Sequence, residues 1–194
     1  NKNECERSFN QTWSEIAALG TFFYINGLNG KKKIAIIGEN CFEWMIAYYA
    51  TICGCNITVP MDAKLSYEDI EDQIIRCDCD AVVCSTKFRK FAEQIKANPA
   101  VPQMEYFFID EFETYYAEGE KMIEAGDDLF DKIEIKPDDL AAIVFTSGTT
   151  GTSKGVMLNQ RNICAVENDI YPVFGMLTTD DLILSVLPPH HTYE

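Results

Sequence analysis

The chain has 194 residues, of which 47% are hydrophobic, and carries a formal net charge of −15 at pH 7. This length and composition can bury a substantial core, which excludes wholesale disorder. The acidity argues against electrostatic binding to nucleic acid or anionic lipid, because both reward positive charge. No hydrophobic run approaches membrane-spanning length, and the polar first residues do not resemble a signal peptide. We therefore expect a cytoplasmic protein without a transmembrane segment.

The eight cysteines allow two interpretations, a metal site or free thiols. Zinc sites usually separate paired ligands by about two to four residues, whereas Cys53 and Cys55, like Cys77 and Cys79, are separated by one. Several other cysteines lie among apolar residues, where a free thiol behaves as a small hydrophobe. Free thiols in a reducing compartment are the favoured interpretation.

Helices and strands are predicted to alternate along the chain. Thr12 and Glu15 have the spacing of a capping box and predict the start of the first helix. Asn40 is placed to cap the second helix, and Ser66 the third. The predicted strands are 33–38, 56–60, 81–84, 105–109, 140–145, 155–158 and 182–187, and the predicted helices start at 12, 42, 66, 88 and 160, with a further acidic helix within 110–131.

This alternation predicts an α/β fold, a layered parallel sheet with flanking helices and right-handed crossovers. In such folds ligands bind beyond the carboxyl ends of the strands. The acidic stretch from Gly119 to Asp131 is the best candidate for a flexible insertion.

The most informative segment runs from Phe145 to Gly155, directly behind the apolar strand candidate. Its glycines let the backbone approach a ligand, and its bunched N–H groups form a concave site for anions. Its hydroxyls add neutral donors, and Lys154 adds a mobile positive charge. A loop of this composition is suited to hold the phosphates of a nucleotide. A flexible linker is the alternative, but linkers rarely follow a hydrophobic strand so closely.

The loop departs from the Walker phosphate-binding pattern. That pattern requires two glycines separated by four residues, then lysine and a serine or threonine. Counting from Gly148, Ser153 occupies the place of the second glycine, and Gly155 follows Lys154. A phosphate-loop NTPase or kinase is therefore only an alternative interpretation.

The residue order of the loop resembles the signature of adenylate-forming enzymes, the superfamily of acyl-CoA synthetases and luciferases. Further segments resemble that family in the same order, namely 12–16, 38–44, 59–62 and 187–194. The last segment is similar to a Leu-Pro-Leu-x-His-x-x-Glu pattern, with Pro189 in place of a leucine and His191 in register. This ending favours fatty acyl-CoA synthetases, of the long-chain type, over luciferases.

The resemblance implies an ATP-dependent ligase. A carboxylic acid, here a fatty acid, would be activated as an acyl-adenylate with release of pyrophosphate, then transferred to coenzyme A. It also implies that residues 1–194 are the N-terminal part of the adenylation domain, with the rest of that domain and a C-terminal lid domain lying beyond this chain. The fragment alone is then expected to be inactive.

The same resemblance assigns roles to individual residues. Lys154 would stabilise the leaving pyrophosphate, and His191 would lie beside the carboxylate and the α-phosphate. The Thr146 hydroxyl would join the shell of Mg²⁺. The remaining residues expected to hold the nucleotide are Ser147, Gly148, Thr149, Thr150, Gly151 and Thr152.

Two other classes of function stay open at this point. An amino-acid or aryl-acid adenylating enzyme would use the same loop, because the residues that select the acid are expected beyond Glu194. A non-catalytic nucleotide-binding module is also compatible with the sequence. The acceptor thiol and the oligomeric state are not specified.

Overall fold

The structure is a computed structural model of the chain. It describes residues 6–146, 153–173, 175, 178, 180–182, 184–185, 187–188 and 190, with the backbone alone for residues 167 and 170–173. In chain order its helices and strands are α1 (Phe9–Ile25), β1 (Lys33–Ile37), α2 (Phe42–Cys53), β2 (Ile57–Met61), α3 (Tyr67–Cys77), β3 (Ala81–Cys84), α4 (Arg89–Lys96), β4 (Glu105–Phe108), α5 (Phe112–Glu124), β5 (Leu140–Thr146), β6 (Lys154–Asn159) and α6 (Gln160–Val173).

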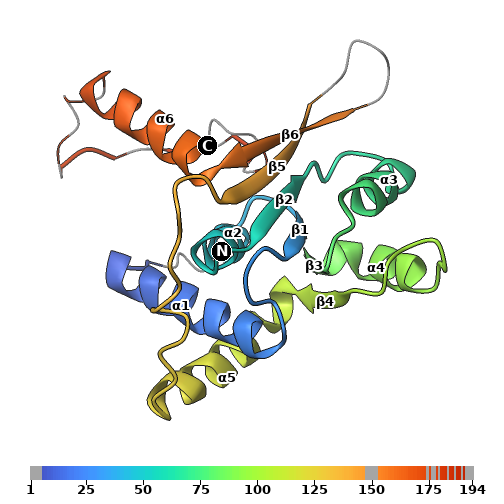
Figure 1. The fold of residues 1–194 in the computed structure, drawn as a ribbon, viewed down its shortest axis with the longest axis horizontal. Coiled ribbons are helices and arrows are strands. Elements are labelled where there is room, and N and C mark those ends of the chain that lie inside the picture. The colour runs from blue at the N-terminus through green and yellow to red at the C-terminus, as the bar shows by residue number, and fades with distance from the viewer. Residues whose placement is uncertain are drawn as a thin grey trace.

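The six strands form one sheet in the order β4-β3-β1-β2-β5-β6 (Figure 1). The pairs among β1 to β5 are all parallel, whereas β6 runs antiparallel to β5. The predicted α/β fold is confirmed, with β6 as the departure from a wholly parallel sheet. Since β5 and β6 are close in sequence, they pair as a hairpin, which needs no helical crossover.

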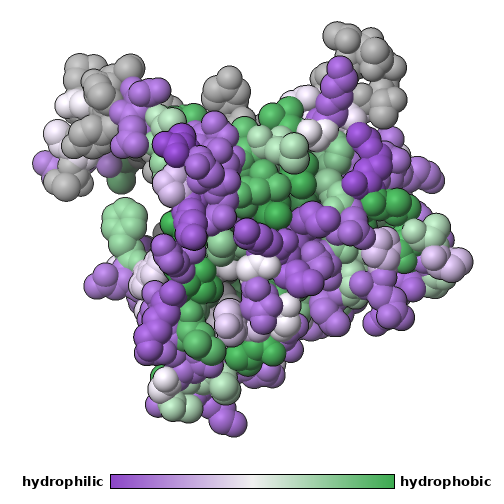
Figure 2. Space-filling view, viewed as in Figure 1, coloured by the Kyte–Doolittle hydropathy of each residue, from purple (hydrophilic) through white to green (hydrophobic). Residues whose placement is uncertain are grey.

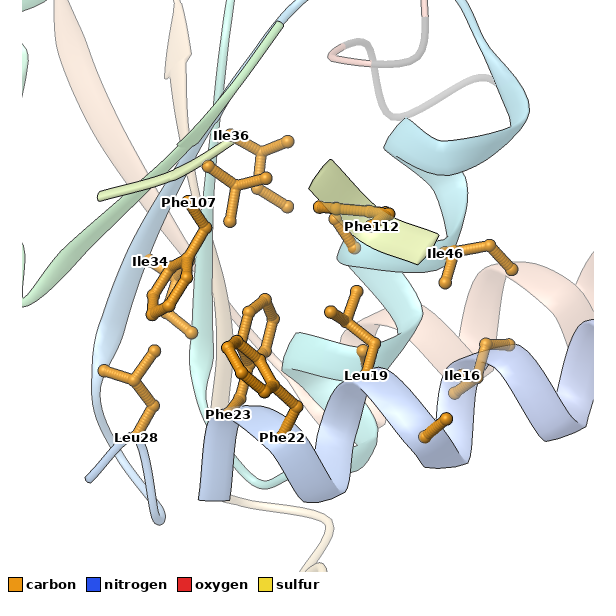
Figure 3. Packing of buried hydrophobic residues seen from close by; sticks show 14 of the residues in the cluster. Ile16, Leu19, Phe22, Phe23, Leu28, Ile34, Ile36, Ile46, Phe107 and Phe112 are labelled. Atoms are coloured by element: carbon orange, nitrogen blue, oxygen red, sulfur yellow. The ribbon is translucent and has the colours of Figure 1, made fainter. Parts of the chain in front are cut away.

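One face of the sheet packs against α1, α2 and α5. Ile34 and Ile36 of β1 point into this layer and are fully buried, as strand alternation requires. Figure 3 shows aromatic and aliphatic side chains from α1, β1 and β4 converging there. The Phe22 ring stacks on Tyr115 with centroids 4.5 Å apart, which joins α1 to α5. This layer makes the sheet a fixed platform for the segments at its edge.

The opposite face packs against α3 and α4. Ala35 and Ile37, which alternate with the residues of the first layer, are buried there with Val82 and Cys84 of β3. Burial on both faces explains why the central strands are continuously hydrophobic in sequence.

The capping box at Thr12 was predicted wrongly. The helix α1 begins earlier, and Ser8 is its N-cap. The Ser8 hydroxyl accepts a hydrogen bond from the Gln11 backbone N–H at 3.3 Å, and the Gln11 side chain accepts one from the Ser8 N–H at 2.8 Å. Ser8 and Gln11 also satisfy the Ser/Thr-x-x-Glu/Gln pattern, so two overlapping signals competed in the sequence. Thr12 instead donates its hydroxyl to the Ser8 carbonyl.

Substitution of Ser8 by alanine is therefore expected to lower the free energy of unfolding by about 1 kcal/mol, because the Gln11 backbone N–H in the first turn of α1 loses its acceptor. Thr12→Ala is the matched control and should have a smaller effect, since its hydroxyl satisfies no orphan amide. Chemical denaturation of both variants measures the difference. Equal losses would contradict Ser8 as the cap.

Asn40 is likewise not the cap of α2. The N-cap is Cys41, which makes no capping hydrogen bond through its side chain. The Asn40 side chain instead donates to the Leu187 carbonyl at 2.8 Å, far away in sequence. A tertiary contact thus outcompeted the local one. The cap predicted for α3 is confirmed, because the Ser66 hydroxyl accepts from the Asp69 N–H at 3.1 Å.

The acidic stretch 119–131 was predicted to be a flexible insertion, and the structure contradicts this. Gly119 lies within α5 and packs so closely on α1 that an added Cβ would lie 1.9 Å from the Ala18 carbonyl oxygen. Phe130 is buried against Gly20 of α1. The acidic residues face solvent while a few small and aromatic residues make the contact, so composition concealed the packing.

The final predicted strand, 182–187, is also wrong for the residues that can be judged. Leu182, Leu184, Ser185 and Leu187 have no strand conformation. Leu182 is fully exposed and Leu184 is 82% exposed. The six-stranded sheet of the described residues does not include them. In the described part of the chain as a whole, no helix is long and hydrophobic enough to cross a membrane.

Candidate functional site

The glycine-rich segment connects the two strands of the β5–β6 hairpin. Thr146, the last residue of β5, pairs directly with Lys154, the first residue of β6. Residues 147–152, which include six of the predicted nucleotide-binding residues, lie outside the described part. The structure therefore places both ends of the predicted loop, and it brings the predicted Mg²⁺ ligand and the predicted catalytic lysine together.

Thr146 and Lys154 project from the same face of the hairpin. Residues directly opposite in an antiparallel pair share a face, and successive residues alternate. Both side chains are exposed, and the Thr146 hydroxyl lies 3.5 Å from the Lys154 carbonyl oxygen, to which it donates. An exposed ammonium and a hydroxyl at the mouth of one loop suit an anionic ligand held above it.

The neighbouring pair, Phe145 and Gly155, faces the other way. Phe145 is partly buried against the layer of α3 and α4. Gly155 lies opposite it, and an added Cβ there would lie 3.1 Å from a methyl of Ile143 and 3.7 Å from the Phe145 ring. The glycine thus lets the aromatic ring cover the backbone of β6. The hairpin has a packed side and an open side, and Lys154 lies on the open side.

A cavity of about 590 Å³, lined by both polar and apolar surface, lies at the carboxyl ends of β1 and β2. Because β5 is parallel to β2, its carboxyl end and the glycine-rich loop lie at the same edge of the sheet. The order of strands reverses around β1, which is where open α/β sheets bind ligands. The lining residues used below are Glu39, Asn40, Asp62, Lys64, Lys87 and His190.

The cavity carries charges of both signs. Lys87 Nζ lies 2.5 Å from Glu39 Oε1, and this hydrogen bond lowers the pKa of Glu39. Asp62 Oδ1 accepts from the Lys64 N–H at 2.9 Å, forming a turn after β2. The other oxygen of Asp62 lies 3.8 Å from His190 Nε2. Together with the Asn40 to Leu187 hydrogen bond, this contact ties the C-terminal segment to the edge of the sheet.

Sequence reasoning selected His191 and placed no role on His190. His191 lies outside the described residues, so its predicted role stays a prediction. His190 lines the cavity beside Asp62. Sequence gave no signal for this contact, because Asp62 and His190 are far apart in the chain.

Arg76 is a second residue that sequence reasoning missed. It is near the end of α3, and its guanidinium donates to the Ser153 carbonyl at 2.8 Å. Ser153 immediately precedes Lys154. Only the tertiary fold brings these two segments together, although a basic residue in the last turn of a helix is a common local pattern.

Metal binding by cysteine finds no support in the described residues, where no three His, Cys, Asp or Glu side chains form a group that could hold an ion. The seven described cysteines are free thiols, of which Cys41 and Cys164 are exposed rather than packed. In one Cys-x-Cys pair the thiols hydrogen-bond to each other, which lowers the pKa of Cys77 and raises that of Cys79.

Comparison with known proteins places this geometry in context. A family model described as AMP-binding enzyme matches residues 2–194. Long-chain-fatty-acid–CoA ligase 5 of Mus musculus is 30% identical over 207 residues, which cover 96% of this chain and 30% of that protein. Crotonobetaine/carnitine–CoA ligase of Proteus sp. (strain LE138) is 25% identical, covering 95% of this chain and 36% of the relative. The chain thus spans about a third of the length of these curated relatives.

Solved structures share the fold. The structure of ATP-bound MatB from Rhodopseudomonas palustris superimposes with a TM-score of 0.80 at 25% identity, over 96% of this chain and 36% of that one. The similarity therefore extends over the sheet, both helical layers and the hairpin.

Proposed function

This chain belongs to the AMP-binding enzyme family, and on that premise we propose that the complete protein joins a carboxylic acid to AMP. A carboxylate oxygen attacks the α-phosphorus of ATP, the bond from that phosphorus to the bridging oxygen breaks, and pyrophosphate leaves. A thiol then attacks the acyl carbon, its proton passes to solvent, and AMP departs. The carboxylate is already ionised at neutral pH, so no strong general base is needed.

The observation that carries this proposal is the pairing of Thr146 with Lys154 across the base of the glycine-rich loop. Attack of one anion on another requires positive charge near the phosphates. Lys154, exposed on the open side of the hairpin, is placed to supply it to the departing pyrophosphate. Charge grows on that group as the bond breaks, so the interaction strengthens in the transition state.

The backbone amides of residues 147–152 are proposed to hold the β- and γ-phosphates. Mg²⁺ fits the Thr146 hydroxyl, because this cation takes oxygen ligands and commonly uses few protein groups beside the phosphates. When bound, it would neutralise phosphate charge. His191 is proposed to orient the acid or the adenylate.

We propose a fatty acid as the carboxylic acid and coenzyme A as the acceptor thiol. The support is the 30% identity to a long-chain-fatty-acid–CoA ligase of the mouse, together with the residues 187–194. A further relative, the crotonobetaine/carnitine–CoA ligase, also names CoA but a different acid. CoA is therefore the better supported half of the pair.

We also propose that residues 1–194 form the N-terminal part of the adenylation domain of a cytoplasmic enzyme. The N-terminal assignment is supported by the relatives, of which this chain covers about a third. The cytoplasmic assignment is compatible with the free thiols, which suit a reducing compartment. Residues 1–194 alone are expected to give no acyl-CoA, because the groups that contact ribose and the catalytic lysine of the lid would be missing. Acyl-CoA formation by the purified 194-residue chain would contradict this.

An assay of ATP–pyrophosphate exchange on the complete enzyme tests the function. Fatty, aryl and amino acids are supplied in parallel, and the expected result is exchange that depends on a fatty acid. Exchange with an amino acid or aryl acid alone would reject the substrate class but keep the adenylation chemistry. Release of ADP in place of AMP would reject adenylation and favour an NTPase or kinase.

A further inference from the structure

In the far half of the β5–β6 hairpin, the described ladder joins β5 to β6 and no longer to β2. The register between β2 and β5 joins Thr58 to Ala142, near the beginning of β5. From Ile143 to Thr146, the strand pairs with β6 within the described residues. We call Ile143–Thr146 and the β6 residues paired with them the arm, and the glycine-rich loop begins and ends on it.

Arg76 of α3 makes contacts at both strands of the arm. Its Nη2 donates to the Ser153 carbonyl at 2.8 Å, and its Nη1 lies 3.4 Å from the Ser153 hydroxyl. The same guanidinium lies over the Phe145 ring of β5, 5.3 Å from the centroid. One side chain thus joins the last residue before β6 to the last aromatic residue of β5.

Asp72 of the same helix orients this guanidinium. It lies one turn earlier on α3, and its Oδ2 is 3.1 Å from Arg76 Nη1. Arg76 is 35% exposed and Asp72 56% exposed, so the ion pair itself contributes little stability. The ion pair instead orients the guanidinium, because it limits the directions in which the remaining N–H groups can point.

We propose that Arg76 is a positioning residue for the phosphate-binding loop, acting through Ser153 on Lys154. This inference rests on the proposed function, since the loop is taken to bind the triphosphate of ATP. Arg76 does not touch the nucleotide in this proposal. It fixes the point at which the loop rejoins the sheet, and with it the start of β6 from which the Lys154 side chain projects.

The guanidinium is required because three hydrogen bonds and one ring contact must be made at once. Its planar fork can reach the Ser153 carbonyl, the Ser153 hydroxyl and Asp72 while its face covers Phe145. A lysine ammonium is a point charge and cannot keep the stacking and the paired hydrogen bonds together. Arg76→Lys should therefore restore only a minor part of what Arg76→Gln removes.

The first experiment compares Arg76→Gln and Arg76→Lys with the wild type by ATP–pyrophosphate exchange in the complete enzyme. We expect Arg76→Gln to raise the KM for ATP by about tenfold, in line with the loss of hydrogen bonds from a charged donor, and to leave the KM for the acid unchanged. A purely structural role would not separate the two KM values. Thermal unfolding checks that the variants are folded.

Arg161→Gln is the matched control. Arg161 also forms an exposed ion pair, with Nη2 3.0 Å from Asp138, but it lies in α6 beside the opposite end of β6. Its removal changes the net charge equally and should leave both KM values at the wild-type level. If Arg161→Gln raises the KM for ATP as much as Arg76→Gln does, the loss of one positive charge explains the effect, and the proposal is overturned.

The second experiment does not depend on catalysis. Hydrogen exchange of the amides in residues 145–156, measured without nucleotide, should become faster in Arg76→Gln while exchange in the central strands stays the same. Unchanged exchange in 145–156 overturns the anchoring role, whatever the kinetics. If the wild-type enzyme exchanges no pyrophosphate with any acid, the proposed function fails, and this measurement still decides whether Arg76 anchors the loop.

Discussion

Replacement of Lys154 by alanine is expected to lower the rate of ATP–pyrophosphate exchange in the complete enzyme by at least about tenfold, equivalent to about 1.4 kcal/mol of barrier. Lys154 begins β6 and is exposed beside Thr146 at the mouth of the loop. Its charge is proposed to stabilise the pyrophosphate as it departs. Because that charge develops mainly in the transition state, the loss should fall on kcat as well as on the KM for ATP.

Lys132→Ala is a suitable control for this variant. Lys132 forms an exposed ion pair with Asp128, four residues earlier in the chain, and it does not line the cavity. Its removal changes the net charge by the same amount and should leave exchange unaltered. Wild-type exchange in Lys154→Ala would remove Lys154 from the mechanism, and with it the principal residue of the proposed site.

Substitution of Gly119 by alanine is expected to lower the melting temperature strongly, with a loss of about 3 kcal/mol in the free energy of unfolding. Glycine to alanine within a helix ordinarily stabilises a protein, because alanine has the higher helix propensity. Here the new Cβ would lie 1.9 Å from the Ala18 carbonyl oxygen, so α1 and α5 must separate. A backbone atom cannot move aside as a flexible side chain can.

Gly20→Ala provides the comparison for this prediction. Its Cβ would lie 2.1 Å from the Phe130 ring, which is a side chain and can be shortened. The double variant Gly20→Ala with Phe130→Ala should therefore lose less stability than the sum of the two single variants. Thermal unfolding of the four variants measures both effects. A melting temperature for Gly119→Ala at or above that of the wild type would contradict the close contact of α1 with α5.

The strands β1 and β3 and the helix α3 were predictable because local signals agreed with the tertiary structure. Each strand is a short hydrophobic run, and Ser66 is the cap of α3 in sequence and in structure. The predictions at Asn40 and Thr12 were wrong because a competing partner was available. Asn40 bonds to Leu187, which no local pattern reveals, and Ser8 lies four residues before Thr12 with an equally good capping signal.

The candidate site shows the same division. Lys154 and Thr146 could be named as candidates because they lie in one continuous segment, and the hairpin register places them side by side, while their roles stay predictions. Arg76 and His190 were not predictable, since each meets the site through a contact between distant segments. The reversal of direction at β6 was also missed, because extended structure after a loop does not specify with which strand it pairs.

The exposed apolar side chains near the hairpin bear on how β6 is aligned with β5. Figure 2 shows hydrophobic side chains gathered on the surface over β2 and β5. Met157 of β6 is 69% exposed and Val156 is 43% exposed. Apolar side chains of this kind do not distinguish one strand alignment from another, so the alignment must depend on the residues beside the loop.

Gly155 and Lys154 make a misaligned hairpin unfavourable on two counts. A shift of β6 by one position would turn every one of its side chains to the opposite face of the sheet. The lysine would then lie on the face that carries the Arg76 guanidinium, cation toward cation, and its Cβ would lie about 3.1 Å from a methyl of Ile143, closer than ordinary contact. Glycine at position 155 therefore favours the observed alignment, in which the Lys154 side chain lies on the open side of the hairpin.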